Sequence, residues 1–154
     1  MKLYLVQHAE AKGEEEDPAR PLSEMGWKDL EKVTSFLRKR GIEIARILHS
    51  GKLRARQTAE KLSEVVRSSE DVQENEGLAP LDDPAKWENR LREETADVML
   101  VGHLPHLSKL AGLLLTGDSN RRVINFKMGG VVCLERDEKG SWSVGWMIIP
   151  QVLR

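Results

Sequence analysis

Two histidines and an arginine follow apolar runs of the chain, and together these residue types suit phosphoryl chemistry. His8 comes just after the apolar run 3–6, and His103 comes just after the run 97–101. A neutral imidazole can attack phosphorus and carry the phosphoryl group as a covalent intermediate. Arg54 adds a guanidinium, whose planar fork of N–H groups matches phosphate oxygens. These residues therefore indicate a site for a phosphoryl group.

The runs 3–6, 44–49 and 97–101 predict the strands that would position these side chains. Short, continuous apolar runs are typical of parallel strands that helices cover on both faces. The carboxyl ends of parallel strands meet at one edge of a sheet, where ligands of open α/β folds bind. We therefore expect Ser50, which follows the second run, to lie near both histidines.

Helical spacing predicts four helices between and after these strands, over residues 23–40, 53–66, 84–94 and 104–115. The first would begin at the N-cap Ser23 and bury a stripe made of Trp27, Leu30, Val33, Phe36 and Leu37. Short strands are expected near residue 72 and at 123–126, 130–136 and 142–149, the last two joined by a turn at 137–140. The pattern predicts one domain over residues 1–154, a three-layer α/β/α sandwich whose mostly parallel central sheet has an antiparallel C-terminal edge.

Composition excludes several classes of partner. The 154 residues are 40% hydrophobic and 32% charged, with a formal net charge of -1, which argues against a nucleic-acid-binding protein. The longest apolar run, around residues 110–115, is interrupted by Gly112 and is too short to span a membrane. The single cysteine, Cys133, has no partner for an internal disulfide, which suits a reducing cytoplasm.

Four segments resemble motifs of the histidine phosphatase superfamily, also called phosphoglycerate-mutase-like. Each motif alone is a weak signal, but four in the correct order are specific. The Arg-Pro-Leu and Gly-His-x-Pro details are most similar to the SixA-type branch, the protein phosphohistidine phosphatases. The segments are Gln7-His8-Ala9-Glu10-Ala11, Arg20-Pro21-Leu22-Ser23 with Gly26, His49-Ser50-Gly51-Lys52-Leu53-Arg54-Ala55-Arg56-Gln57-Thr58-Ala59 and Leu100-Val101-Gly102-His103-Leu104-Pro105-His106-Leu107-Ser108.

The resemblance implies a role for each matching residue. His8 matches the nucleophile that becomes transiently phosphorylated, and Arg54 and His103 match residues that hold the phosphoryl oxygens. It implies no metal or organic cofactor, and a substrate that is a phosphohistidine on a protein. The alternative within the superfamily is a general phosphomonoesterase that acts on small phosphorylated molecules. Residues expected to bind phosphate or substrate beside the three catalytic residues are Gln7, Arg20, Ser50 and Arg56.

Gln7 departs from the superfamily's pattern, which has arginine just before the nucleophile. Losing one charged contact in a desolvated pocket costs ~2–4 kcal/mol of transition-state stabilisation, by analogy with removing one oxyanion donor. Arg56 or Lys52 are candidates to supply the missing charge. A further alternative is a catalytically inactive module that binds phosphate or a phosphoprotein.

A general acid would be needed to protonate an alkoxide leaving group, and the candidates are Glu76, Asp82 and Asp83. None lies in a recognisable acid motif, and Asp83 before Pro84 is better explained as a helix N-cap. A phosphohistidine substrate depends less on a general acid, because an imidazole protonated on its other nitrogen leaves as a neutral ring. The absence of a clear acid thus favours a P–N substrate over a sugar phosphate.

Two other histidines and an acidic run have simpler explanations. His49 is expected to pack behind the site, and His106, in the first turn of a helix, is expected to be exposed. The run Glu14-Glu15-Glu16-Asp17 reads as a solvated loop, although its place after the nucleophile also allows it to steer a basic protein partner.

Overall fold

The computed structural model describes all 154 residues and is built around a six-stranded sheet in the order β5-β3-β6-β1-β7-β8. The first four strands in this order are parallel to one another, and β7 and β8 join antiparallel at the edge. The expected mostly parallel sheet with an antiparallel C-terminal edge is therefore confirmed. The strands are β1 (Lys2–Gln7), β3 (Arg46–His49), β5 (Gln73–Glu74), β6 (Val98–Gly102), β7 (Val131–Arg136) and β8 (Trp142–Ile148).

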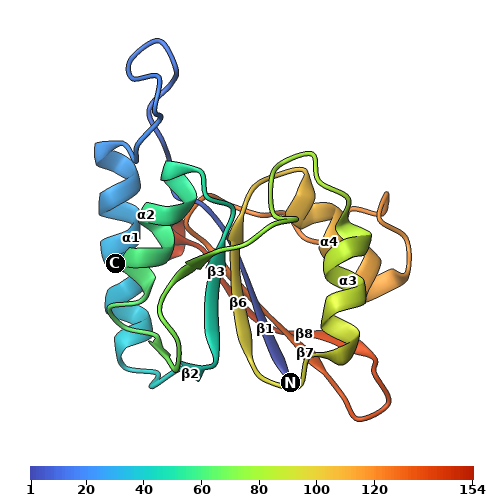
Figure 1. Cartoon of the computed structure of the whole chain (residues 1–154). Coiled ribbons are helices and arrows are strands. Elements are labelled where there is room, and N and C mark those ends of the chain that lie inside the picture. The colour runs from blue at the N-terminus through green and yellow to red at the C-terminus, as the bar shows by residue number, and fades with distance from the viewer.

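Helices cover both faces of this sheet and complete three layers (Figure 1). α1 (Glu24–Arg38) and α2 (Leu53–Leu62) lie on one face, and α3 (Pro84–Glu93) and α4 (His106–Thr116) lie on the other. A two-stranded ribbon of β2 (Glu43–Ile44) and β4 (Arg67–Ser68) and a terminal 3-10 helix, η1 (Pro150–Val152), complete the elements. No helix is both long and apolar enough to cross a membrane.

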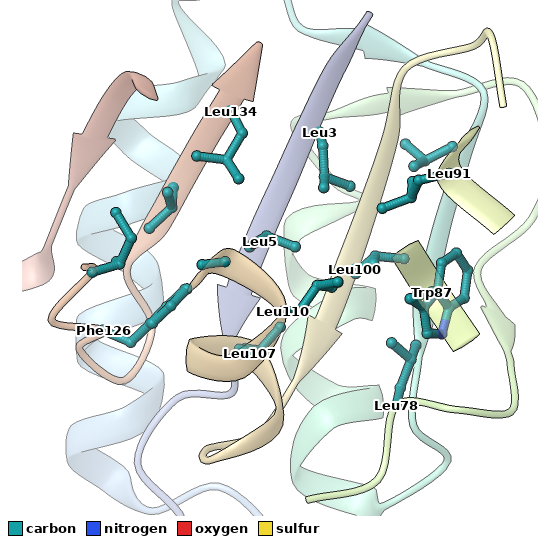
Figure 2. Close-up of a cluster of buried hydrophobic side chains, with 14 of the residues drawn as sticks. Leu3, Leu5, Leu78, Trp87, Leu91, Leu100, Leu107, Leu110, Phe126 and Leu134 are labelled. Carbon is teal, nitrogen blue, oxygen red and sulfur yellow. The ribbon is translucent and has the colours of Figure 1, made fainter. Parts of the chain in front are cut away.

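Alternation along β1 explains why two cores form. Leu3 and Leu5 belong to the cluster beneath α3 and α4, whereas Tyr4 and Val6 belong to the cluster beneath α1 and α2. Successive side chains of a strand point to opposite faces, so a strand that is apolar at every position can bury both. Figure 2 shows Leu3 and Leu5 beside Leu100 in the first cluster. β1 is consequently held rigidly, up to the residue that precedes His8.

Several predicted boundaries differ from the structure. The run 44–49 is divided between β2 and β3, because Ala45 separates the residues that pair with β4 from those that pair with β6. The second helix ends at Leu62 rather than residue 66. Residues 123–126 form no strand. Ile124 and Phe126 are apolar because they are buried in the core cluster that Leu3 joins.

Trp27 was expected in the buried stripe of the first helix, and this prediction was wrong. Its side chain is 38% exposed, whereas Leu30, Val33 and Leu37 are fully buried. Gly26, rather than Trp27, contacts the preceding loop. A Cβ at position 26 would come within 2.1 Å of the Glu10 carbonyl oxygen. The helix therefore approaches this loop more closely than a large side chain would allow.

Candidate active site

The carboxyl ends of β1, β3 and β6 bring His8, Ser50 and His103 to one edge of the sheet. The imidazole rings of His8 and His103 have their centroids 5.0 Å apart. Ser50 Oγ lies 2.6 Å from His103 Nε2, within hydrogen-bond distance. Three residues that are far apart in the sequence thus form one group, as the strand pattern predicts.

The His8 ring is oriented with one nitrogen free for chemistry. Its Nδ1 lies 2.7 Å from the carbonyl oxygen of Ala9, which can only accept, so Nδ1 donates and Nε2 holds the lone pair. The backbone amide of His8 donates to the Gly102 carbonyl at 3.0 Å and ties the residue to β6. The pKa of His8 is lowered to about 4, chiefly by burial and also by the nearby charges of Arg54 and Arg20, although the Ala9 contact opposes this. The imidazole is therefore neutral and nucleophilic near pH 7.

His103 is also held neutral. It is 2% exposed, and burial is the main cause that lowers its pKa to about 3. His8, Arg54 and Lys52 also contribute to this lowering, because they disfavour a further positive charge. Its Nδ1 has no hydrogen-bond partner in the protein. Cations and neutral imidazoles are thus concentrated at the carboxyl edge of the sheet.

Arg54 lies in the first turn of α2 and forms no ion pair, although the charge of Glu14 opposes the lowering of its pKa. The helix has no acidic residue in its first turn, and no ion pair involves Arg54. Its Nε is buried without a partner, and burial followed by the charge of Arg20 lowers its pKa. The start of a helix adds partial positive charge from its free N–H groups. This corner of the site is consequently suited to hold an oxyanion.

Thr58 joins the His8 loop to the Arg54 turn, a role that sequence reasoning missed. Its hydroxyl accepts a hydrogen bond from the Ala9 amide at 3.0 Å and donates to the Arg54 carbonyl at 2.8 Å. The residue is completely buried. The feature of the sequence that indicates this role is a threonine in the inward-facing stripe of the helix, because a buried hydroxyl must find hydrogen-bond partners.

Arg20 reaches the site from the long loop that follows His8. The loop closes on itself through a bridge between Ala11 and Leu22, and Arg20 Nε donates to the Lys12 carbonyl at 3.0 Å. Arg20 has a φ of 50°, and it is the one residue other than glycine with a positive φ. Its charge lowers the pKa of both His8 and Arg54, which places the guanidinium near them.

The structure separates the two cations considered as replacements for the missing arginine. Arg56 is 54% exposed and pairs with Glu60 at 3.7 Å, and its charge contributes to the pKa of neither His8 nor His103. Lys52 does contribute to the pKa of His103. Gln7 itself has a buried Oε1 that has no partner. Arg56 is therefore not brought into the group, and Lys52 lies closer to the chemistry.

None of the three candidate acids is aimed at the histidines. Asp82 accepts a hydrogen bond from the Ala79 amide at 2.9 Å, and Asp83 caps α3 by accepting from the Ala85 amide at 2.9 Å. Glu76 is exposed and lines, with Asp82 and Ser50, a hollow of about 260 Å³ beside the site. No carboxylate contributes to the pKa of His8 or His103.

The expectation for His106 was wrong, whereas that for His49 agrees with its burial. His106 is completely buried with both ring nitrogens unpartnered, and burial lowers its pKa. It precedes Leu110 by one helical turn and so shares the inward-facing stripe of α4. His49 is 5% exposed and its Nδ1 accepts from the Gly51 amide at 3.0 Å. No group of three or more His, Cys, Asp or Glu residues is arranged to hold a metal ion.

Comparison with known proteins identifies the family of this chain. The family model of the histidine phosphatase superfamily (branch 1) matches residues 3–100. Phosphohistidine phosphatase SixA of Escherichia coli strain K12 is 25% identical over 155 aligned residues, which cover 97% of this chain and 94% of that protein.

Solved structures agree on the fold. A protein histidine phosphatase SixA in complex with tungstate superposes with a TM-score of 0.84 at 24% identity, covering 98% of both chains. An Escherichia coli protein described as an alpha-ribazole-5'-P phosphatase superposes with a TM-score of 0.78 at 16% identity, covering 97% of this chain and 98% of the other. These structural matches confirm the expected fold. The match to the family model shows that the protein is a phosphatase. The chain belongs to the histidine phosphatase superfamily (branch 1), and the relatives of this family that it resembles include SixA phosphohistidine phosphatases.

Proposed function

We propose that the protein removes the phosphoryl group from a phosphohistidine on another protein, through a covalent intermediate on His8. The observation that carries this proposal is the neutral His8 ring, whose Nε2 holds a lone pair and whose pKa is lowered by Arg54 and Arg20, two cations that form no ion pair. Nε2 attacks phosphorus as the P–N bond of the substrate breaks, and the substrate imidazole, protonated on its other nitrogen, leaves as a neutral ring. Arg54, Arg20 and His103 bind the phosphoryl oxygens during the transfer.

Hydrolysis of the intermediate completes the cycle. Water attacks the phosphorus of phospho-His8, the P–Nε2 bond breaks, and inorganic phosphate is released together with the proton lost by water. During both steps the Ala9 carbonyl accepts from Nδ1–H, so it stabilises the positive charge of the phosphorylated ring. Ser50 positions His103, and Gln7 and Lys52 lie beside the phosphoryl group.

The preference for phosphohistidine is supported by the candidate acids, none of which contributes to the pKa of His8 or His103, because a P–O substrate would leave as an alkoxide that needs a proton. The E. coli relative is named as a phosphohistidine phosphatase, and the solved SixA holds tungstate, an oxyanion of phosphate-like shape. A small-molecule phosphatase is the second candidate, because exposed Glu76 lines the hollow that contains Ser50. We further propose a cytoplasmic location, which the single buried, free Cys133 suits.

The test is turnover of a phosphohistidine-bearing protein beside para-nitrophenyl phosphate, with wild type and His8→Ala. His8-dependent hydrolysis of the protein substrate, with little action on the ester, supports the proposal. Comparable action on both substrates supports the small-molecule phosphatase. Binding of the phosphoprotein without hydrolysis supports the inactive module.

A matched pair of arginine variants sharpens the test. Arg54→Gln should lower kcat/KM about 100-fold, because it removes an oxyanion contact in a buried setting. Arg56→Gln, two residues along the same helix, should leave kcat/KM within about twofold, because its side chain is exposed and pairs with Glu60. Equal losses in both variants would contradict the assignment of Arg54.

A further inference from the structure

Several large exposed apolar side chains lie on segments that adjoin the proposed active site. The structure exposes nine such residues, and five of them belong to segments that adjoin the site at the carboxyl edge of the sheet. We call these five the apolar rim. They are Met25, Trp27, Leu81, Leu104 and Met128.

Three members of the rim lie on the α3 and α4 side. Leu104 directly follows His103 and is 38% exposed. Met128 precedes Gly129, whose amide donates to the Gln7 carbonyl at 2.9 Å, so it lies beside the end of β1. Leu81 is 88% exposed and follows the segment 75–79, which lines a hollow together with Ser50.

The other two members lie at the start of α1. Met25 and Trp27 are 51% and 38% exposed and line a hollow of about 740 Å³ with Glu10 and Lys12, which follow His8 in the chain. Figure 1 shows the start of α1 and the loop 10–22 at the same end of the molecule, with the loop extending beyond the helices. Exposed apolar side chains thus adjoin the loop that follows His8 as well as the segments near His103 and Ser50.

The proposed phosphoryl transfer assigns no role to the side chains of the apolar rim. Phosphoryl transfer uses the buried imidazoles and cations, and a small polar phosphate compound would engage those groups alone. Scattered exposed apolar residues need no explanation, but a group around a binding site marks contact with another molecule. The rim residues are therefore candidates to contact the part of the substrate that carries the phosphoryl group.

We infer that the apolar rim docks a folded protein whose phosphohistidine stands among apolar side chains. The inference rests on the proposed function and adds the surface that selects a protein over a small molecule. The exposed carboxylates of Glu14, Glu15 and Glu16 on the extended loop favour a partner with basic residues beside that apolar patch. The partner is thus a protein with an apolar face, a phosphohistidine at its centre and a basic margin.

The experiment compares one phosphohistidine in two contexts. The protein substrate is a small folded protein with a histidine on an apolar face, phosphorylated chemically with phosphoramidate, and the small substrate is free phosphohistidine. Leu81→Ser and Met25→Ser should each lower kcat/KM for the protein about tenfold, mainly through KM, since rim truncation removes buried contact. Neither should change kcat/KM for free phosphohistidine by more than about twofold.

Val152→Ser is the matched control, because Val152 is a 70% exposed apolar residue in η1, outside the rim. It should leave both substrates unaffected. Equal losses on both substrates for the rim variants would overturn the inference, because they would mean that the rim shapes the site. No loss on the protein substrate would overturn it as well.

Binding separates this inference from the proposed function. In a His8→Ala background, Leu81→Ser should raise the Kd of the phosphorylated protein about tenfold, whether or not the wild type hydrolyses it. If the wild type hydrolyses nothing but this affinity difference remains, the proposed function fails and the docking surface stands. If hydrolysis is His8-dependent but the affinity is unchanged, the docking inference fails alone.

Discussion

At the scale of single residues, Gln7 departs from the superfamily motif that the chain otherwise resembles. A neutral amide stands where the superfamily motif has a guanidinium, and its Oε1 is buried without a partner. A buried carbonyl oxygen pointed at an anion would repel it, so the amide must contribute through its N–H₂ group or contribute nothing. In the proposed reaction, Lys52 and Arg20 would supply the charge that the motif arginine otherwise gives, since their charges act on His103 and His8.

Gln7→Arg should raise kcat/KM for the phosphohistidine protein at least about tenfold, because a charge-assisted contact in a desolvated site replaces a neutral one. Gln7→Leu, which removes the amide without adding charge, should lower kcat/KM. Steady-state kinetics of the three proteins checks this. A loss in Gln7→Arg as large as that in Gln7→Leu would show that the site is built around the amide.

The protonation of His8 is a second property at this scale. Its ring should titrate in the folded protein near pH 4, well below the ordinary 6.5, as followed by the histidine ring signals in NMR. Arg54→Gln should raise this pKa, since it removes a neighbouring positive charge. Arg56→Gln should leave His8 unchanged and raise the pKa of His49 instead, because Arg56 acts on that ring. A His8 midpoint near 6.5 in wild type would contradict the buried, neutral nucleophile.

At the scale of elements, α2 holds the site together. It supplies Arg54 from its first turn, and one turn later Thr58 bonds both the Arg54 carbonyl and the Ala9 amide. The helix and the end of β1 are therefore joined by a single hydroxyl. The distance between nucleophile and oxyanion-binding arginine depends on this link.

Thr58→Val keeps the shape of the side chain but leaves the Ala9 amide buried without an acceptor. It should destabilise the protein by about 1–3 kcal/mol and lower kcat/KM, since the nucleophile loop loses its anchor. The control is Thr34→Val, because Thr34 is equally buried but its hydroxyl bonds only carbonyls of its own helix. Urea denaturation and kinetics check both variants. Similar behaviour of the two would show that the Thr58 link is not special.

At the scale of the whole molecule, all four histidines are buried and their pKa values are lowered, with burial as the main cause. The unfolded chain binds protons near pH 6.5 while the folded protein does not until a lower pH. The unfolded state therefore binds more protons in between, and the free energy of unfolding falls as pH decreases from about 6.5. Above that pH the contribution of these histidines is fully present.

The free energy of unfolding should consequently drop between pH 7.5 and 5.5 by about 1 kcal/mol for each strongly shifted histidine. Urea denaturation followed by circular dichroism at the two pH values measures it. His106→Leu should reduce the drop, because it removes a buried ring that lies outside the proposed catalytic group. An unchanged stability over this range in wild type would contradict the neutral buried state of these rings.

Local sequence patterns were sufficient to predict much of the fold and part of the candidate site. Strand periodicity placed His8, Ser50 and His103 at one edge, because parallel strands align their carboxyl ends wherever they lie in the sequence. Capping chemistry placed Ser23 and Asp83 at helix starts, since an N-cap depends on neighbouring residues alone. These features depend on a few consecutive residues, which is why a single sequence determines them.

The tertiary structure alone decided which side chains face the site. Arg54 and Arg56 are two positions apart on one helix, but only the packing of α2 against the end of β1 directs Arg54 inward and Arg56 to solvent. The same holds for Trp27, which is exposed, and His106, which is buried, both against expectation. Helical spacing reveals that a stripe exists, whereas its boundaries depend on which distant elements cover it. The direction of a side chain is thus a property of contacts between segments, and those contacts appear only when the chain has folded.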